Sequence, residues 1–265
     1  MRTEPFYVKG TILGPTGNIS GIGNQLFCIA ATLAYSIDND KIPFFPQLGI
    51  DREIKKYRNL FYKNLNTNFF TNNFQNYYQE NSFNYEEIPK FKGNTLLKGY
   101  FQSEKYFKHH RERIIHLLNI REIRDQVIEK YGDHSNHISI HVRRKDYLEL
   151  KDYHYNLTME YYKKALKIMG LDNPFIIFSD DIEWCKANFK FLQNVIYSEN
   201  KEDFEDMILM STCKNNIIAN STFSWWGAWF NENKDKKILA PKKWFGPKNQ
   251  MHDLSDLLPS EWTRV

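Results

Sequence analysis

The chain has 265 residues, of which 42% are hydrophobic and 26% charged, ordinary values for a globular protein. This length suffices for one large domain or for two of about 130 residues each. The formal net charge of +4 is only mildly basic, and lysines and arginines are interspersed with acidic residues, so a nucleic-acid partner is not favoured. No run approaches the roughly 18 apolar residues of a membrane span, and we expect neither a transmembrane segment nor export.

Cysteines and glycosylation sequons favour a reducing compartment. The cysteines are too few and too scattered for a disulfide framework or a metal cluster, so we expect reduced core thiols at Cys28, Cys185 and Cys213. Sequons begin at Asn18, Asn156 and Asn220, and the last of these lies in a segment that we expect to contact phosphate. We therefore predict a cytoplasmic protein and leave peripheral contact with a membrane open.

The first half of the sequence alternates predicted strands and helices. In chain order these are a strand over 6–13, a glycine- and proline-rich loop over 14–23, a helix from about Asn24 and a strand over 42–45. The segment 59–85 is rich in asparagine and aromatic residues and has a weak period, so we interpret it as an irregular insertion or short helices. A strand over 95–100 and a helix over 103–118, with Ser103 as its N-cap, precede a second helix that runs to Lys130.

The second half repeats strand and helix more clearly. Strands are predicted over 138–142, 175–179, 194–197, 216–219 and 237–240, and helices over 158–169 with Thr158 as N-cap, 181–189, 203–212 and 222–231. Such alternation is typical of parallel sheets flanked by helices. The polar segment Tyr131–Asn136 is the best candidate for a linker. We therefore predict an α/β fold with two Rossmann-like domains, residues 1–130 and 131–265, that face a central cleft.

Two adjacent arginines follow the predicted strand over 138–142. A guanidinium makes planar, bidentate contacts with phosphate and is always charged. Arg143 and Arg144 stand at the C-terminal end of that strand, which is where open α/β sheets bind their ligands. The sequence therefore predicts a phosphorylated ligand here, and we expect His141 to hydrogen-bond that ligand beside Arg143.

Three other segments carry polar groups after predicted strands, and each has a structural alternative. The turn at 21–25 would let an anion approach a helix N-terminus, or would be a tight turn with Asn24 as N-cap. One of Asp180 and Asp181 would contact a ligand such as guanine, or Asp180 would be the N-cap of the next helix and Asp181 would compensate its macrodipole. The third segment would cap a helix or bind a diphosphate through Asn220, Ser221, Thr222 and Ser224. The tryptophans that follow it are expected to pack that helix against the sheet.

No metal site is predicted. His137 and His141 lie on one face of a strand without a nearby carboxylate or cysteine. Asp38 and Asp40 stand past the end of a predicted helix, where a capping or turn role is expected. We therefore expect no metal ion and no cofactor other than a donor substrate.

Five short sequence blocks follow one another along the chain, each present once. They are Gly21–Gln25, Gly99–Tyr106, His141–Asp146, Phe178–Trp184 and Asn220–Trp229. Together they resemble the α-1,2-fucosyltransferases of glycosyltransferase family 11, over most of the chain and least over residues 46–95. The resemblance implies a GT-B fold and an inverting, metal-independent enzyme that uses GDP-β-L-fucose and a glycan acceptor. In such a fold residues 1–130 would be the acceptor-side domain and residues 131–265 the GDP-sugar-binding domain.

The resemblance also implies roles for the matched residues. Arg143 would bind the β-phosphate and stabilise the departing GDP, while Arg144 would brace the loop or also contact phosphate. Asp180 would accept hydrogen bonds from guanine. The diphosphate would be lined by Ser221, Thr222 and Ser224, with Gly23 and Asn24 approaching from the other domain.

The identity of a general base is left open. Asp146 would orient Arg143 or serve the acceptor hydroxyl. The candidates for the base are Glu149, Asp152 and His154, and a histidine suits proton transfer at neutral pH. The chain departs from the family at Lys145, where glycine is common, and in the longer loop before Gly23, which affects loop geometry but not the reaction class.

We therefore expect transfer of L-fucose from GDP-fucose to a galactoside hydroxyl, in an α-1,2 linkage. The alternatives are transfer from another GDP-deoxyhexose, such as GDP-colitose or GDP-rhamnose, and a nucleotide- or glycan-binding protein that has lost catalysis. A nucleic-acid binder that uses the paired arginines is disfavoured because Asp146 follows them closely. The sequence leaves the acceptor and the oligomeric state open.

Overall fold

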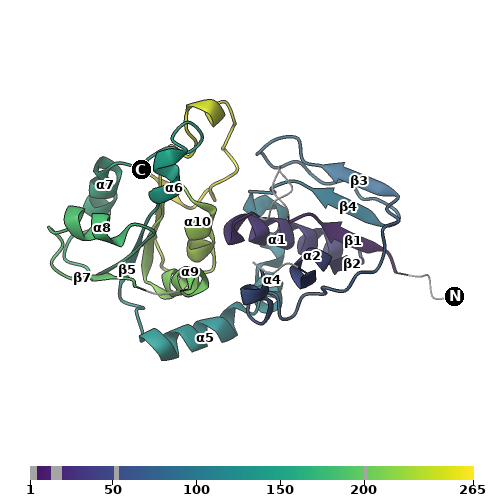
Figure 1. Ribbon diagram of the computed structural model, residues 1–265, viewed down its shortest axis with the longest axis horizontal. Helices are drawn as coiled ribbons and strands as arrows, with labels where there is room; N and C mark the ends of the chain where they lie inside the picture. The colour runs from purple at the N-terminus through teal and green to yellow at the C-terminus, as the bar shows by residue number, and fades with distance from the viewer. Residues whose placement is uncertain (1–4, 13–19, 51–53, 200–201) are drawn as a thin grey trace. The chain divides into compact units, whose positions relative to one another are not determined.

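The structure is a computed structural model that describes residues 5–12, 20–50, 54–199 and 202–265. Its contacts divide the chain into two compact units (Figure 1). Unit 1 comprises Met1–Ile123 with Asp253–Pro259, and unit 2 comprises Arg124–His252 with Ser260–Val265. The division falls inside helix α5 (Ile120–Tyr131), whereas we placed the domain boundary after residue 130. That boundary and the cleft between the domains stay predictions.

Unit 1 is built, in the part of the chain that the structure describes, on a parallel sheet with the strand order β2-β1-β4-β3. The strands are β1 (Tyr7–Gly10), β2 (Ile42–Phe44), β3 (Asn76–Gln79) and β4 (Thr95–Lys98). Three of them confirm predicted strands, but β3 contradicts the irregular or helical interpretation of its segment. This edge strand alternates half-buried and exposed residues and its sequence is Asn-Tyr-Tyr-Gln, so it lacks the apolar pattern that would have predicted it.

Helix α1 (Ile22–Asp38) follows β1 and packs closely against it (Figure 1). Residues Phe27–Ser36 are all buried, as expected for a helix that is apolar all round. A Cβ atom on Gly10 of β1 would lie only 2.2 Å from Oγ1 of Thr32, so the close approach requires glycine. The N-cap of α1 is Gly21, so the capping alternative for Asn24 was wrong. Residues 13–19 of the predicted strand and glycine-rich loop lie outside the described residues.

The remaining helices of unit 1 are short. They are α2 (Pro46–Ile50), α3 (Lys55–Arg58), η1 (Glu104–Tyr106), η2 (Lys108–His110) and α4 (Arg111–Leu117). The single helix predicted over 103–118 is thus divided into two 3₁₀ turns and α4. The break lies at Phe107, whose φ of −145° is not helical. Ser103 is the predicted N-cap, because its side chain accepts a hydrogen bond from the backbone N–H of Lys105.

The described residues of unit 2 form a parallel sheet with the strand order β10-β9-β8-β5-β6-β7. The strands are β5 (Ile138–Val142), β6 (Phe175–Ser179), β7 (Val195–Tyr197), β8 (Asn215–Ile217), β9 (Ile238–Ala240) and β10 (Thr263–Arg264). Strand β5 is buried along its whole length, as expected for an inner strand of a parallel sheet. The predicted strands of this half are confirmed, and only β10 was not expected.

Helices connect the strands of unit 2, and the four helices predicted for this half are confirmed, whereas the short helix over 145–149 was not expected. The helices are α6 (Lys145–Glu149), α7 (Met159–Met169), α8 (Ile182–Asn188), α9 (Asp203–Thr212), α10 (Thr222–Trp229) and the 3₁₀ turn η3 (Pro247–Asn249). Thr158 occupies the N-cap position of α7, although its side chain makes no capping hydrogen bond. Trp225, Trp226 and Trp229 are buried, which confirms that they pack α10 into the core. Each unit therefore has the α/β architecture that the sequence predicted.

Two further features concern the chain as a whole. Its cysteines are all buried and unpaired. None of the helices in the described part of the chain combines the length and the apolar character that crossing a bilayer requires. The cytoplasmic location stays a prediction.

Candidate active site

Most of the residues that the sequence analysis singled out lie at the carboxyl end of β5 and its neighbouring strands in unit 2. From β5 the chain continues to β6 and β7 on one side of β5, and then to β8 on its other side. The strand order therefore reverses between β5 and β8, and open α/β sheets bind ligands beyond such a switch point. Arg143 follows β5 and Asn220 follows β8, so both predicted segments flank this point.

Arg143 begins the turn after β5, and two carboxylates hold its guanidinium. Nη2 donates to Oδ2 of Asp146 at 2.9 Å, and Nε lies 3.4 Å from Oδ2 of Asp180. The side chain is 35% exposed, and among the described residues Nη1 has no protein partner. Burial acts to lower the pKa of Arg143, but the ion pairs outweigh it and raise the pKa. A charged guanidinium with donors to spare is therefore accessible at the switch point.

Arg144 is tied to the loop after β6. Its backbone N–H donates to Oδ1 of Asp180 at 2.9 Å, and its Nε donates to Oδ2 of Asp181 at 3.1 Å. The guanidinium carbon lies 3.9 Å from the ring centre of Trp184, at cation–π distance. These contacts favour the bracing role of Arg144, and its predicted contact with phosphate stays a prediction. The sequence analysis did not assign Trp184 to this contact.

Asp180 and Asp181 face the arginine turn because β5 and β6 are neighbours. Val142 stands opposite Ser179 in the sheet, so the residues that follow the two strands come together. Asp181 is the N-cap of α8 and accepts a hydrogen bond from the backbone N–H of Trp184, so the alternative that made Asp180 the N-cap was wrong by one residue. The oxygens of Asp180 face the two arginines instead, and its predicted contact with guanine stays a prediction.

Tyr147 connects the two sides of the switch point, and the sequence reasoning missed it. Its hydroxyl donates to the backbone oxygen of Asn220 at 3.0 Å, and burial raises the pKa of Tyr147 to about 12. Its ring is stacked on that of His154, with centres 4.1 Å apart, and the guanidinium carbon of Arg143 lies 5.7 Å from its centre. The spacing of Arg143, Asp146 and Tyr147 at i, i+3 and i+4 was the signal that would have found it.

Two buried polar side chains at this edge have an atom without a partner. His141 is 4% exposed, and among the described residues its Nδ1 accepts or donates no hydrogen bond. Burial, aided by the charge of Arg143, lowers the pKa of His141 to about 3, so the ring is neutral. Asn220 donates from Nδ2 to the backbone oxygens of Tyr155 and Trp244, but its buried Oδ1 is unpaired within the described chain. Because buried polar atoms are nearly always paired, we expect a ligand or a water molecule to contact both, and Oδ1 of Asn220 requires a donor.

The hydroxyl residues of the turn after β8 are partly used within the turn. Ser221 is the N-cap of α10 and accepts a hydrogen bond from the backbone N–H of Phe223 at 3.3 Å. Ser224 is fully buried and its hydroxyl lies 3.3 Å from the backbone oxygen of Ser221. Thr222 is the first residue of α10 and is half-buried. The capping alternative thus accounts for Ser221, and contact of these residues with a diphosphate stays a prediction.

The other predicted donor residues lie in unit 1, in the first turn of α1. Gly23 is buried there, and Oδ1 of Asn24 accepts a hydrogen bond from Nε2 of Gln102 at 3.0 Å. Gln25 fixes the turn further, since its Nε2 donates to the backbone oxygen of Ser20 and its Oε1 accepts from the hydroxyl of Tyr62. The approach of Gly23 and Asn24 to the donor stays a prediction.

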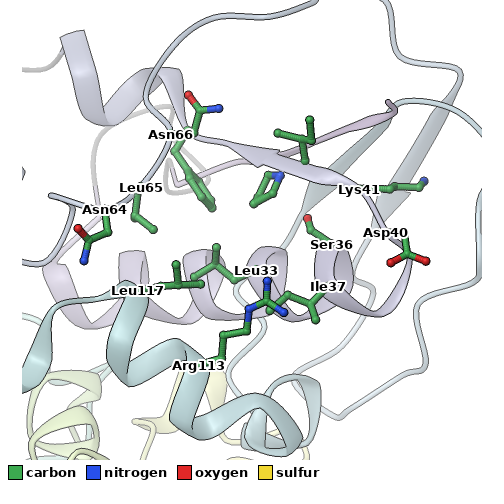
Figure 2. Close-up of a pocket in the computed structure, with 13 residues that line it drawn as sticks. Leu33, Ser36, Ile37, Asp40, Lys41, Asn64, Leu65, Asn66, Arg113 and Leu117 are labelled. Carbon is green, nitrogen blue, oxygen red and sulfur yellow. The ribbon is translucent and has the colours of Figure 1, made fainter. Parts of the chain in front are cut away.

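Unit 1 also contains a pocket of about 500 Å³ that no predicted site residue lines (Figure 2). Leu33, Ser36 and Ile37 of α1 form one wall, and Arg113 extends from α4 toward them. Asn64 and Asn66 lie at another side. The pocket stands at the C-terminal part of α1, whereas Gly23 and Asn24 stand at its N-terminus.

The chain is similar in sequence to known glycosyltransferases. The profile of the family described as Glycosyl transferase family 11 matches residues 29–265. The O-antigen biosynthesis glycosyltransferase WbnK of Escherichia coli is 37% identical over 191 residues, which cover 66% of this chain and 62% of that protein. An alpha-1,2-colitosyltransferase of Escherichia coli is 35% identical over 192 residues, which cover 66% and 63%. The chain thus spans less than two thirds of the length of these curated relatives.

Among solved structures, the chain is similar to the NodZ alpha-1,6-fucosyltransferase soaked with GDP-fucose. The TM-score is 0.49 at 12% sequence identity, and the match covers 86% of this chain and 93% of that structure.

Proposed function

The chain belongs to glycosyltransferase family 11, and we propose that it transfers L-fucose from GDP-β-L-fucose to a galactoside hydroxyl, with inversion and in an α-1,2 linkage. The observation that carries the proposal is the position of Arg143. Its partly exposed guanidinium stands at the switch point of a parallel sheet and is held by two carboxylates. Such a group suits a diphosphate leaving group.

Arg143 supports a reaction without a metal ion at the diphosphate. As the bond from C1 of the sugar to the β-phosphate oxygen breaks, negative charge accumulates on the diphosphate, and a fixed guanidinium stabilises that charge. The N–H groups that Asp146 and Asp180 do not engage are the donors for this contact. The two carboxylates act as positioning residues, and the scheme requires no cofactor.

The charge balance of the site indicates how a diphosphate would be recognised. Arg143 and Arg144 are surrounded by the carboxylates of Asp146, Asp180 and Asp181, so this group has no excess of positive charge. A diphosphate would therefore be bound by directed hydrogen bonds and not by a broad positive field. The N-terminus of α10 supplies such directed donors, whereas the unpaired Oδ1 of Asn220 is an acceptor and suits a hydroxyl group of the ligand.

His154 supports the proposed proton transfer. For inversion, the acceptor oxygen forms its bond to C1 on the face opposite GDP while the bond to phosphate breaks, and the hydroxyl proton passes to a base. Burial and the charge of Arg143 lower the pKa of His154 below its ordinary 6.5, although Asp146 acts to raise it, so the ring is neutral at pH 7. Asp152 is less suited because it pairs with Lys248 at 3.1 Å.

One similarity favours a second donor. The relative that is named an alpha-1,2-colitosyltransferase is 35% identical over the aligned residues. Colitose is L-fucose without its 3-hydroxyl group, and the same GDP site would serve both donors. GDP-colitose is therefore the alternative donor, and GDP-rhamnose has no comparable support.

A panel of donors tests the proposal. The full chain is incubated with each GDP-sugar and a galactose-terminated acceptor, and the product is examined by mass and by the position of the new bond. We expect a fucosylated product linked at O2 of galactose. Transfer of colitose but not of fucose would make GDP-colitose the donor in place of GDP-fucose. Calorimetric binding of GDP without transfer from any donor would indicate a binding protein instead of an enzyme.

A further inference from the structure

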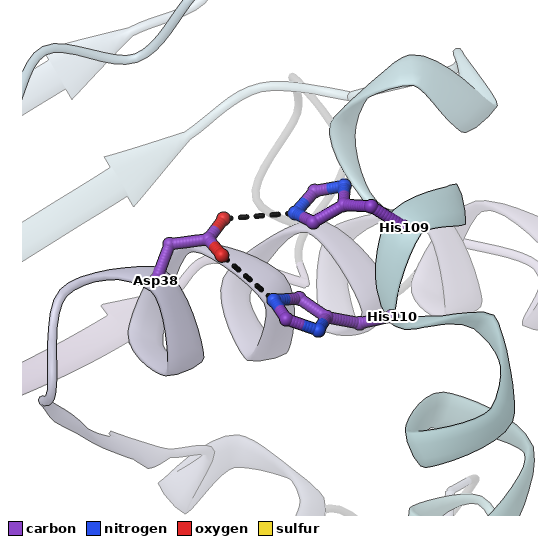
Figure 3. Close-up of side chains that lie close together, drawn as sticks. All are labelled: Asp38, His109 and His110. Carbon is purple, nitrogen blue, oxygen red and sulfur yellow. Dashed lines mark hydrogen bonds and ion pairs between the residues drawn. The ribbon is translucent and has the colours of Figure 1, made fainter.

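Unit 1 contains a cluster of two histidines and an aspartate (Figure 3). Asp38 is the last residue of α1, and His109 and His110 are consecutive residues of η2. Nε2 of His109 lies 2.9 Å from Oδ2 of Asp38, and Nε2 of His110 lies 2.7 Å from Oδ1. At 1.5 Å per residue, Asp38 is about 22 Å along α1 from Gly23, so the cluster is separate from the predicted donor contacts of this unit.

The convergence of the two rings is unusual for neighbouring residues. Consecutive side chains of a 3₁₀ turn point about 120° apart, yet the centres of the two imidazoles are only 4.3 Å apart. Both rings direct a nitrogen at the same carboxylate (Figure 3). One ligand atom from each of the three side chains can be chosen so that all lie within 4.8 Å of one another. In a tetrahedral site, zinc bonds of about 2.0–2.2 Å hold neighbouring ligand atoms about 3.3–3.6 Å apart. The present N···O distances of 2.9 and 2.7 Å therefore lengthen by roughly half an ångström or slightly more when an ion replaces the hydrogen bonds.

The carboxylate is in the state that a metal ion requires. An aspartate carboxylate is ionised at neutral pH, and each of its two oxygens offers lone pairs to an ion. The three side chains are partly exposed to solvent, so that an ion has access to them. A pocket of about 400 Å³ lies beside Asp38 and His109, and Glu87 also lines it. This space suits a water ligand or a fourth protein ligand.

We propose that Asp38, His109 and His110 bind one Zn²⁺ ion, which joins the end of α1 to η2. Two imidazoles and a carboxylate suit a borderline transition metal, whereas Mg²⁺ and Ca²⁺ prefer oxygen ligands. Each ring binds through Nε2, so a neutral ring carries its hydrogen on Nδ1 and a protonated ring releases one proton. The ion stabilises unit 1 and takes no part in the proposed sugar transfer. This site departs from the absence of a metal site that the sequence predicted.

Zinc binding by the full chain, prepared without a polyhistidine tag, tests the proposal. Competition with a chromogenic chelator gives the affinity and stoichiometry, and the visible absorption of bound Co²⁺ reports the ligand set. We expect one Zn²⁺ per chain and a loss of at least about tenfold in affinity in Asp38→Asn and in His110→Gln. The control is His116→Gln, which removes an exposed histidine of α4 and leaves the affinity unchanged.

Thermal unfolding supplies a second measurement that does not depend on activity. Zn²⁺ raises the melting temperature of the unmodified chain but not that of Asp38→Asn, and Mg²⁺ raises neither. Absence of stoichiometric zinc binding by the folded chain would overturn the proposal, as would equal affinity in Asp38→Asn, His110→Gln and His116→Gln. The three side chains would then form only a hydrogen-bonded ion pair between α1 and η2.

Discussion

Two roles are open for Asp180, positioning of the arginines and binding of guanine. Its carboxylate contacts both arginines of the turn after β5, whereas the family resemblance implied hydrogen bonds from guanine. We predict that Asp180→Asn weakens the binding of GDP and of IDP, which lacks the 2-amino group, by similar factors of about ten. The reason is that the variant loosens Arg143 and Arg144 and does not remove a contact to the base. Calorimetry with both nucleotides measures this.

Asp146→Asn is the matched control, because Asp146 is the other carboxylate on Arg143. Asp146→Asn should also weaken the binding of GDP and of IDP by equal factors. A selective loss of GDP affinity in Asp180→Asn, with no such selectivity in Asp146→Asn, would make Asp180 a guanine ligand and contradict the positioning role.

The buried, neutral ring of His141 links stability to pH. The pKa of His141 is about 3 in the folded chain and near its ordinary 6.5 in the unfolded chain, so between these values the unfolded chain binds more protons. The stability is complete above about pH 6.5 and falls as the pH decreases, by up to about 1.4 kcal/mol per pH unit. We predict a shallower pH dependence of the unfolding free energy in His141→Asn, measured by urea denaturation from pH 7 to pH 4. Equal slopes in both proteins would contradict the neutral burial of His141.

At the scale of elements, the close contact between β1 and α1 leaves no room for a side chain at position 10. A Cβ on Gly10 would lie 2.2 Å from Oγ1 of Thr32, which donates to the backbone oxygen of Cys28. We predict that Gly10→Ala lowers the unfolding free energy by about 1–3 kcal/mol. The double variant Gly10→Ala/Thr32→Ala should recover part of this loss, because the clashing atom is gone. If the double variant recovers none of the unfolding free energy in denaturant unfolding, glycine is required at position 10 by the strand itself and not by the contact with Thr32.

The elements that the sequence predicted well are those with a strong local signal. The strand over 138–142 was found because it is apolar and ends in polar residues, and α10 because hydroxyl residues precede a run of tryptophans. The helix over 103–118 was predicted as one element, since its apolar period continues across Phe107, where the backbone is not helical. Propensity does not report such a break, and Phe107 is a buried residue whose ring centre lies 6.0 Å from that of Phe27. Strand β3 was missed because an edge strand needs little apolar surface.

At the scale of the whole molecule, the sequence indicated which polar residues follow the strands but not which of them contact one another. Arg143, Asp180 and Asn220 were chosen because each follows a predicted strand. Which of them meet depends on the order of strands, and β5 pairs with β6 on one side and β8 on the other. The cluster of Asp38 with His109 was invisible for the same reason, since some 70 residues separate them in the sequence. The family resemblance implied roles for these residues, and the fold shows which side chains contact one another.

Turnover of Arg143→Ala tests the central claim most directly, because the proposed reaction depends on this guanidinium at the departing GDP. The variant is compared with the unmodified chain and with Arg113→Ala, which removes an arginine from the pocket of unit 1, and thermal unfolding verifies that each is folded. We predict that Arg143→Ala lowers kcat by about 10²–10³-fold, as for the loss of one oxyanion donor, while Arg113→Ala keeps its turnover of GDP-sugar. A folded Arg143→Ala chain with near-normal kcat would contradict the account.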